Sequence, residues 1–187
     1  MPNLHVIGGA NGAGKTTTAL KLLPGFLDCY EYVNADSIAQ GLSPFKPESV
    51  AIQAGRLMLK RLHDLAASHV DFAFETTLAS RSFVSFFRKC QSGGYQVNLI
   101  YLWLESVELA IERVRERVAA GGHDIPEDVI RRRYDAGREN FYRLYLPLAS
   151  EWVAYDNSGE APLIVAAGGV GIEIVVHDQP TWDKIIR

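Results

Sequence analysis

Cysteine is scarce in this sequence, whose 187 residues include only Cys29 and Cys90. The two are far apart and outside any C-x-x-C spacing, which argues against a disulfide framework and a cysteine zinc site, so both are expected to be free thiols. Long apolar runs are also missing, since none approaches the roughly 18 residues that a membrane helix needs. The segment 1–5 lacks the basic region and apolar core of a signal peptide. We therefore expect a soluble, cytoplasmic protein with no membrane partner.

An excess of positive charge is absent as well. The formal net charge is -3, so no global positive field attracts a polyanion, and a nucleic-acid-binding role is disfavoured. Apolar residues make up 48% of the chain and charged residues 22%, a balance typical of soluble globular proteins rather than of disordered chains. A chain of this length fits one domain, so we expect residues 1–187 to form a single unit.

The hydrophobic pattern alternates between short strands and longer helical stretches. Strands are predicted at 4–8, 32–35, 71–75, 97–104, 152–155, 163–166 and 172–176. Helices are predicted at 16–23, 51–65, 83–90, 107–118 and 130–148. Gly168 and Gly169 are predicted to form the hairpin turn between the last two strands. The alternation predicts an α/β fold with a mostly parallel sheet and helices on both faces, in which ligands bind at the carboxyl ends of the strands.

A glycine-rich segment follows the first predicted strand and precedes the first predicted helix. It matches the phosphate-binding pattern G-x-x-x-x-G-K-[ST] at every fixed position, as Gly9, Ala10, Asn11, Gly12, Ala13, Gly14, Lys15 and Thr16. Glycines let backbone N–H groups approach phosphate oxygens, and the helix N-terminus adds a partial positive charge. We expect this P-loop to bind ATP, with Lys15 at the β- and γ-phosphates, Thr16 on Mg²⁺ and Thr17 beside them.

Several classes of P-loop protein are disfavoured by what the rest of the chain lacks. GTPases read guanine through an N-K-x-D loop, and this sequence contains none. Transport and motor ATPases usually carry an apolar strand ending in Asp, whereas the third predicted strand here ends in Phe74 and Glu75. A single domain of this size suits the P-loop kinases of small molecules, which need a base near the acceptor and cations over the phosphates. The sequence therefore favours phosphoryl transfer to a hydroxyl of a small molecule.

Polar residues follow the second and third predicted strands. Asp36 is the predicted catalytic base, because the end of its strand should lie beside the P-loop. The alternative is that Asp36 caps a helix turn beginning at Ser37. Glu75 and Thr77 are predicted to contact the acceptor, since polar groups at that position need partners. The alternative for Glu75 is support of magnesium or of Lys15.

Arginines are concentrated in the segment 113–140, which contains no lysine. Guanidinium groups suit bidentate phosphate contacts, and two or three of these arginines are expected to touch phosphate. The segment is therefore predicted to form an arginine-rich helical lid, with Gly121, Gly122 and His123 as a hinge. The alternative is a solvated pair of helices whose arginines form ordinary ion pairs with the interleaved acidic residues.

With these residues assembled, the chain resembles the zeta toxin family of P-loop kinases over nearly its whole length. The resemblance rests on the ordered segments GGANGAGKTT, VNADSIAQGLSP, FETTLASRS, GGHDIPEDVIRRRY and YDNSG. Members of that family phosphorylate a hydroxyl on the amino sugar of UDP-N-acetylglucosamine and are held in check by an antitoxin. The resemblance implies a nucleotide-sugar-like acceptor, ATP and Mg²⁺ as cofactors, and an antitoxin protein as a partner.

The resemblance also implies roles for individual residues. These are Lys15 and Thr16 for ATP and magnesium, Asp36 as the base, Glu75 and Thr77 for the acceptor, Arg117 and Arg133 for transition-state charge, and Asn157 near the adenine. Where the family carries Glu-Gly-Thr-Leu-Arg after the third strand, this chain has alanine in place of the arginine. Arg81 is the nearest arginine and is the candidate for that acceptor contact.

Two alternatives stay open. One is a kinase for a nucleoside, a polynucleotide end or another metabolite. A polynucleotide kinase needs a basic channel with exposed aromatic side chains, and the segment 86–89, with sequence Phe-Phe-Arg-Lys, is the candidate for it. The other alternative is an ATP-binding regulator without transfer activity. The presence of Asp36 and Glu75 beside an intact P-loop argues against that reading.

Overall fold

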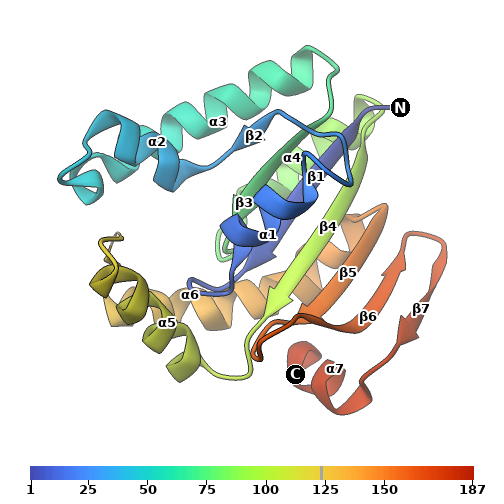
Figure 1. Ribbon diagram of the computed structural model, residues 1–187. Coiled ribbons are helices and arrows are strands. Elements are labelled where there is room, and N and C mark those ends of the chain that lie inside the picture. Colours follow the sequence, from blue (N-terminus) through green and yellow to red (C-terminus); the bar gives the residue numbers. More distant parts are fainter. Residues whose placement is uncertain (123) are drawn as a thin grey trace.

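The computed structural model describes residues 1–122 and 124–187, so His123 of the predicted hinge lies outside the described residues. Within them, seven strands form one sheet in the order β2-β3-β1-β4-β5-β6-β7 (Figure 1). In chain order the strands are β1 (Asn3–Gly9), β2 (Tyr32–Val33), β3 (Phe72–Thr76), β4 (Gln96–Trp103), β5 (Glu151–Asp156), β6 (Leu163–Gly169) and β7 (Ile172–Val176).

The parallel part of the sheet brings three predicted ligand-binding segments together. Strands β2, β3, β1, β4 and β5 run parallel, and β6 and β7 are added antiparallel. Gly8 of β1 lies opposite Thr76 of β3, and Val33 of β2 lies opposite Phe74. The P-loop, the start of the helix after β2 and the loop after β3 therefore meet at one edge of the sheet, where ligands of such folds bind.

Helices cover both faces of the sheet, as the alternation of strands and helices predicts. They are α1 (Lys15–Leu22), α2 (Ala35–Leu42), α3 (Ala51–Ala67), α4 (Phe83–Ser92), α5 (Val107–Ala119), α6 (Glu127–Asn140) and α7 (Gln179–Ile186). The short turns are η1 (Pro47–Val50), η2 (Phe141–Tyr145) and η3 (Leu146–Leu148). No helix in the described ranges is both long and apolar enough to cross a membrane.

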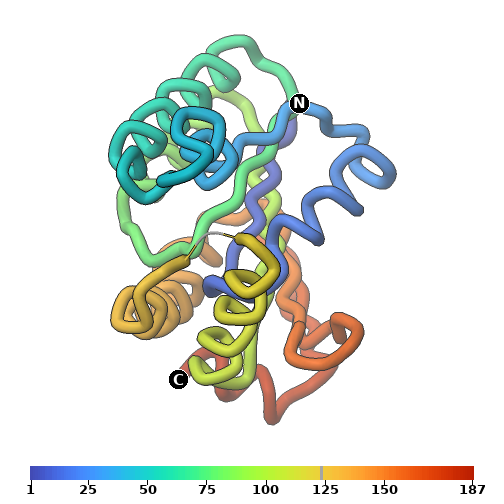
Figure 2. The backbone as a smooth tube through the Cα atoms, turned by 60° about the vertical axis from the view of Figure 1, so that its left-hand side comes forward, coloured from blue at the N-terminus to red at the C-terminus, as the bar shows by residue number. Residues whose placement is uncertain are grey.

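Alternation along β1 divides the core into two clusters. Val6 packs on one face with buried residues of α3, α4, η2 and α7, whereas Ile7 packs on the other with residues of α1 and α5. Side chains that alternate between two apolar faces are expected of a central parallel strand. Figures 1 and 2 show α2 and α3 on one side of the carboxyl ends of the strands and α5 and α6 on the other.

The expected position of the last hairpin turn is wrong. Gly168 and Gly169 lie within β6, and the turn that follows is formed by Val170 and Gly171, whose φ is +76°. A Cβ on Gly168 would lie 3.0 Å from the ring of Trp152, so this glycine permits close packing rather than a turn.

The segment 86–89, the candidate channel of the polynucleotide-kinase alternative, does not expose its aromatic side chains. Phe86 and Phe87 are buried in the core and cannot stack on bases. The structure also has a C-terminal helix in a segment for which the sequence predicts no element, and this helix, α7, buries Trp182 and Ile185. Trp182 stacks on Trp152 with ring centroids 5.4 Å apart, so tertiary packing stabilises this short helix.

Candidate active site

The P-loop forms a backbone cradle between β1 and α1. Gly12 and Gly14 have φ of +77° and +83°, values that glycine adopts without steric strain. A Cβ on Gly12 would lie 2.8 Å from the carbonyl oxygen of Ala110, and one on Gly14 would lie 2.8 Å from the amide nitrogen of Asn157. The loop is therefore packed so closely against its surroundings that both positions require glycine.

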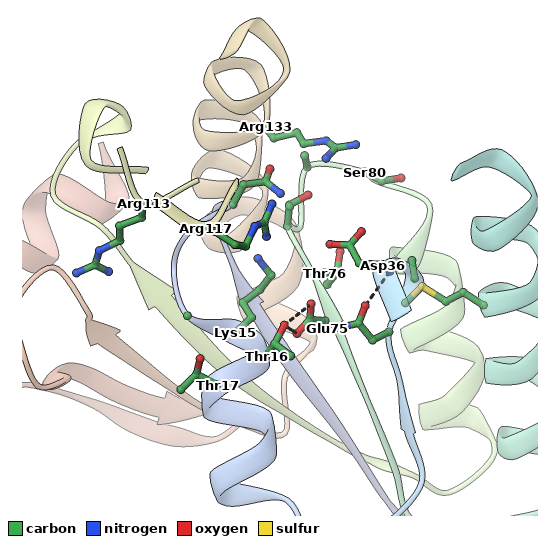
Figure 3. A pocket seen from close by; sticks show the side chains of 18 of the residues that line it. Lys15, Thr16, Thr17, Asp36, Glu75, Thr76, Ser80, Arg113, Arg117 and Arg133 are labelled. Atoms are coloured by element: carbon green, nitrogen blue, oxygen red, sulfur yellow. Dashed lines mark hydrogen bonds between the residues drawn. The ribbon is translucent and has the colours of Figure 1, made fainter. Parts of the chain in front are cut away.

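A cavity of about 460 Å³ opens where this loop meets the ends of β2 and β3 (Figure 3). Of the residues predicted from the sequence, those lining it are Asn11, Gly12, Gly14, Lys15, Thr16, Thr17, Asp36, Glu75, Thr77, Arg117 and Arg133. Residues to which the sequence assigns no individual role also line it, among them Met58, Ser80, Phe83 and Arg113. Residues predicted to bind the nucleotide and residues predicted to bind the acceptor thus border one space.

Lys15 is the central cation of this cavity. Its Nζ donates a hydrogen bond to the carbonyl oxygen of Ala10 at 2.8 Å. Burial lowers the pKa of Lys15 below its ordinary value, the carboxylates of Glu75 and Asp36 oppose that shift, and Arg117 and Arg133 add to it. All four charged side chains therefore act on the same amine, and a perturbed pKa in a cavity of this kind marks a candidate functional site.

Thr16 and Glu75 form the oxygen-rich side of the cavity. The Thr16 hydroxyl donates to the Glu75 carboxylate, with Oγ1 at 2.9 and 3.1 Å from its two oxygens. Hydroxyl and carboxylate oxygens are hard donors, and Mg²⁺ in phosphate sites is held by one or two such groups together with the phosphates. The residues present therefore fit a magnesium ion at Thr16, with Glu75 next to it.

Asp36 lies in the first turn of α2 and does not cap that helix. The cap is Asn34, whose side-chain oxygen accepts hydrogen bonds from the backbone N–H groups of Asp36 at 2.7 Å and Ser37 at 3.1 Å. The alternative role of Asp36 as a helix cap is thus wrong, because β2 ends one residue before Asn34 and the helix begins at Ala35. The Asp36 carboxylate is left to border the cavity.

The loop after β3 is clamped by residues of α6 and η2. The Asn140 side chain donates to the carbonyl oxygens of Leu78 at 2.9 Å and Ala79 at 3.0 Å, and the Tyr145 hydroxyl donates to that of Ser80. A Cβ on Gly137 would overlap the carbonyl oxygen of Thr77. Residues of the predicted lid segment therefore hold the loop 77–80 in place, which no local sequence signal indicates. We call this segment the acceptor loop because it carries Thr77, which is predicted to contact the acceptor.

Arg81 is placed away from the cavity. The residues lining it include Ser80 but not Arg81, which is exposed. The turn around it is held locally, because the backbone N–H of Ser82 donates to the Ser80 hydroxyl at 3.2 Å. Ser80 thus borders the cavity, whereas Arg81 does not.

The arginines of the predicted lid divide into two groups. Arg113, Arg117 and Arg133 line the cavity, and Figure 3 shows Arg117 pointing toward Lys15 and Arg113 pointing away from it. Elsewhere in the segment, Arg115 pairs with Glu127, Arg131 pairs with Glu108, and Arg138 donates to the carbonyl of Lys184. The ion-pair alternative thus holds for Arg115 and Arg131, whereas Arg117 and Arg133 line the cavity together with Arg113.

Asn157 contacts the outer side of the P-loop. Its side-chain amide donates to the carbonyl oxygen of Ala13 at 2.8 Å. Arg113 donates to the carbonyl oxygens of Asn157 and Ser158, both at 2.8 Å. The predicted adenine neighbour is therefore also a support of the phosphate cradle.

The sheet order, the P-loop and the cavity beside it define a P-loop kinase fold. Shikimate kinase from Acinetobacter baumannii shares this fold, with a TM-score of 0.52, 18% identity and 86% of each chain covered. The family model described as Zeta toxin matches residues 1–165, and the chain belongs to this family. An uncharacterized protein of Haemophilus influenzae is 34% identical over 128 residues, which cover 67% of this chain and 88% of that protein.

Two further solved structures share the fold. A chain of the AvrRxo1-ORF1:-ORF2 complex with ATP matches with a TM-score of 0.78 and 20% identity, covering 99% of this chain. The present chain spans only 63% of the length of that relative. The structure of the PezAT chromosomal toxin-antitoxin system of Streptococcus pneumoniae matches with a TM-score of 0.64 and 17% identity, covering 89% of this chain and 72% of that one.

Proposed function

We propose that this protein is an ATP-dependent kinase that transfers the γ-phosphoryl group to a hydroxyl of a small molecule of the nucleotide-sugar class. The observation that carries the proposal is that Asp36 borders the same cavity as Lys15 and Thr16. An alcohol bound beside Asp36 would face the terminal phosphate of a nucleotide bound in the P-loop. A pure nucleotide-binding regulator has no need of a carboxylate at that position.

The transfer step follows from the placement of these groups. The Asp36 carboxylate accepts the proton of the acceptor hydroxyl, and the hydroxyl oxygen forms a bond to the γ-phosphorus. The bond from that phosphorus to the oxygen bridging it to the β-phosphate breaks, and ADP leaves with the electron pair. Lys15, Arg117 and Arg133 supply positive charge to the oxygens on which charge develops. Magnesium bound at Thr16 with the nucleotide would neutralise part of the phosphate charge.

The acceptor end of the cavity supports a sugar-like ligand. Among the residues lining the cavity, Met58 and Phe83 provide apolar surface, and Thr77 and Ser80 are hydroxyl-bearing residues. A pocket with apolar walls and a few placed polar groups fits a ring with hydroxyl substituents, because the polar groups fix its orientation. We extend the proposal to an antitoxin protein as partner, because the PezAT relative belongs to a toxin-antitoxin system.

The test is transfer of label from γ-labelled ATP, with magnesium, to a component of a metabolite extract. We expect a labelled small molecule that is not formed by the Lys15→Ala variant. The matched control is Lys21→Ala, which removes an exposed lysine of the same helix. Label found only as inorganic phosphate would contradict the kinase assignment. Label at polynucleotide ends would contradict a small-molecule acceptor and indicate a polynucleotide kinase instead.

A further inference from the structure

A chain of hydrogen bonds joins the P-loop threonine to the start of α2. The Thr16 hydroxyl donates to the Glu75 carboxylate, and the Tyr32 hydroxyl donates to the same carboxylate at 2.7 Å. The Asn34 side-chain amide donates to the Tyr32 oxygen at 3.3 Å. Asn34 is also the residue that caps α2 through the N–H of Asp36. Hydrogen bonds therefore connect Tyr32 directly to the Glu75 carboxylate and, through Asn34, to the backbone N–H of Asp36.

Tyr32 can serve only as a donor to Glu75. Its oxygen already accepts from Asn34, and an ionised carboxylate accepts but does not donate. A hydrogen bond from a neutral hydroxyl to a carboxylate is among the stronger ones in proteins.

The two hydroxyl donors fix the direction of the Glu75 carboxylate. Oε2 receives hydrogen bonds from Tyr32 and from Thr16, whose Oγ1 also lies 3.1 Å from Oε1. The carboxylate is therefore turned toward the N-terminus of α1, which is the magnesium side of the cavity. Tyr32 sits on β2 opposite Ala73 of β3, so the phenol approaches Glu75 from the strand next to β3.

We propose that Tyr32 is a positioning residue that holds Glu75 toward Thr16, so that Glu75 serves the magnesium-nucleotide side of the site rather than the acceptor. The inference rests on the proposed function, since it assumes that Thr16 binds magnesium with ATP. It assigns to Tyr32 no contact with ATP or with the acceptor. The role of Asn34 is to hold the Tyr32 oxygen while it caps the helix that carries Asp36.

The experiment is ATP binding by titration calorimetry over a series of magnesium concentrations, with the wild type and Tyr32→Phe. Loss of an outer partner of a metal site typically reduces metal affinity or activity about 10- to 100-fold. We expect Tyr32→Phe to need about 10-fold or more magnesium for half-maximal tightening of ATP binding. Binding of ATP without magnesium should stay within about 2-fold of the wild type.

Tyr30→Phe is the matched control. Tyr30 precedes Tyr32 by two residues and its hydroxyl is paired with Asp28, but its side chain is 75% exposed. The control should leave the magnesium dependence unchanged. Thermal unfolding of both variants checks folding, because a purely structural role of Tyr32 would lower the melting temperature without changing the magnesium dependence. That result would overturn the inference.

A double substitution tests whether Tyr32 acts through Glu75. If it does, Tyr32→Phe added to Glu75→Gln should change the magnesium dependence no further than Glu75→Gln alone. Additive effects would overturn the inference. Failure of the inference and of the proposed function are distinguishable, because the calorimetry needs no acceptor. Suppose that Tyr32→Phe alters the magnesium dependence of ATP binding but the wild type transfers no phosphoryl group. That outcome would contradict the kinase proposal and still support the role of Tyr32.

Discussion

The side-chain amide of Asn157 donates a hydrogen bond to the backbone carbonyl of Ala13, linking the end of β5 to the P-loop across 144 positions of sequence. The amide also fills the space that a Cβ on Gly14 would need. Arg113 holds the Asn157 backbone in turn. The shape of the phosphate cradle therefore depends on the second half of the chain and not only on the glycines of the loop itself.

Replacing Asn157 by alanine should weaken ATP binding. The change leaves the Ala13 carbonyl without its donor, and such a hydrogen bond contributes about 0.5–1.5 kcal/mol. We expect the Kd for ATP to rise about 2- to 10-fold in calorimetry, in line with that energy. Asn98→Ala is the control, because its amide bonds to Asn3 far from the cavity. Unchanged ATP affinity in Asn157→Ala would mean that the P-loop keeps its shape without the hydrogen bond from Asn157.

Replacing Gly137 by alanine should destabilise the protein and the acceptor loop. Alanine is favoured over glycine in a helix by about 1 kcal/mol, but here its Cβ would overlap the carbonyl oxygen of Thr77. Overpacking of this kind costs about 1–3 kcal/mol, so the overlap outweighs the propensity. We expect a lower free energy of unfolding in denaturant titration and a larger rise in the KM for the acceptor than in the KM for ATP.

The matched control is Gly55→Ala in α3. Among the described residues, none outside the adjoining turns of α3 comes within 4 Å of the position that a Cβ on Gly55 would take. Helix propensity should therefore determine the effect, and we expect Gly55→Ala to stabilise the protein by up to about 1 kcal/mol. Equal stabilisation of both alanine variants would contradict the close packing of Gly137 in α6 against the carbonyl oxygen of Thr77.

ATP binding should be linked to proton uptake at alkaline pH. Burial lowers the pKa of Lys15, so part of the unliganded protein carries a neutral amine at pH values below the ordinary lysine pKa. Phosphate favours the charged amine, so binding raises this pKa and takes up a proton. Affinity should therefore fall as the pH rises through the lowered pKa. Calorimetry in buffers of different ionisation enthalpy measures the uptake, and Lys15→Met should show none from this group.

Much of the site could be predicted from the sequence because its elements are local. The P-loop carries its own pattern, and parallel strands bring their carboxyl ends to one edge, so the order of motifs along the chain is enough to place Asp36 and Glu75 beside the loop. The mostly parallel α/β fold of the Zeta toxin family is confirmed. The structure places Asp36 and Glu75 at the cavity beside the P-loop, whereas their chemical roles remain proposals.

The remainder depends on contacts between distant segments. The residue pattern of the triplet 131–133 does not by itself show that Arg133 lines the cavity while Arg131 pairs with Glu108, because the rotation of α6 is set by packing. Only the family resemblance selects Arg133. Asn140 and Tyr145 bind the acceptor loop more than 60 positions away. The prediction of a turn at Gly168 and Gly169 is wrong, because glycine in a closely packed strand gives the same local pattern as glycine in a turn.

The role of Asp36 is tested most directly by Asp36→Asn, measured for both ATP affinity and phosphoryl transfer. General base catalysis contributes about 10²- to 10⁴-fold, so transfer should fall by that factor while the Kd for magnesium-ATP stays within about 2-fold of the wild type. The control is Asp28→Asn, at an exposed position with φ of +48° that asparagine tolerates. Transfer at the wild-type rate by Asp36→Asn would contradict the account.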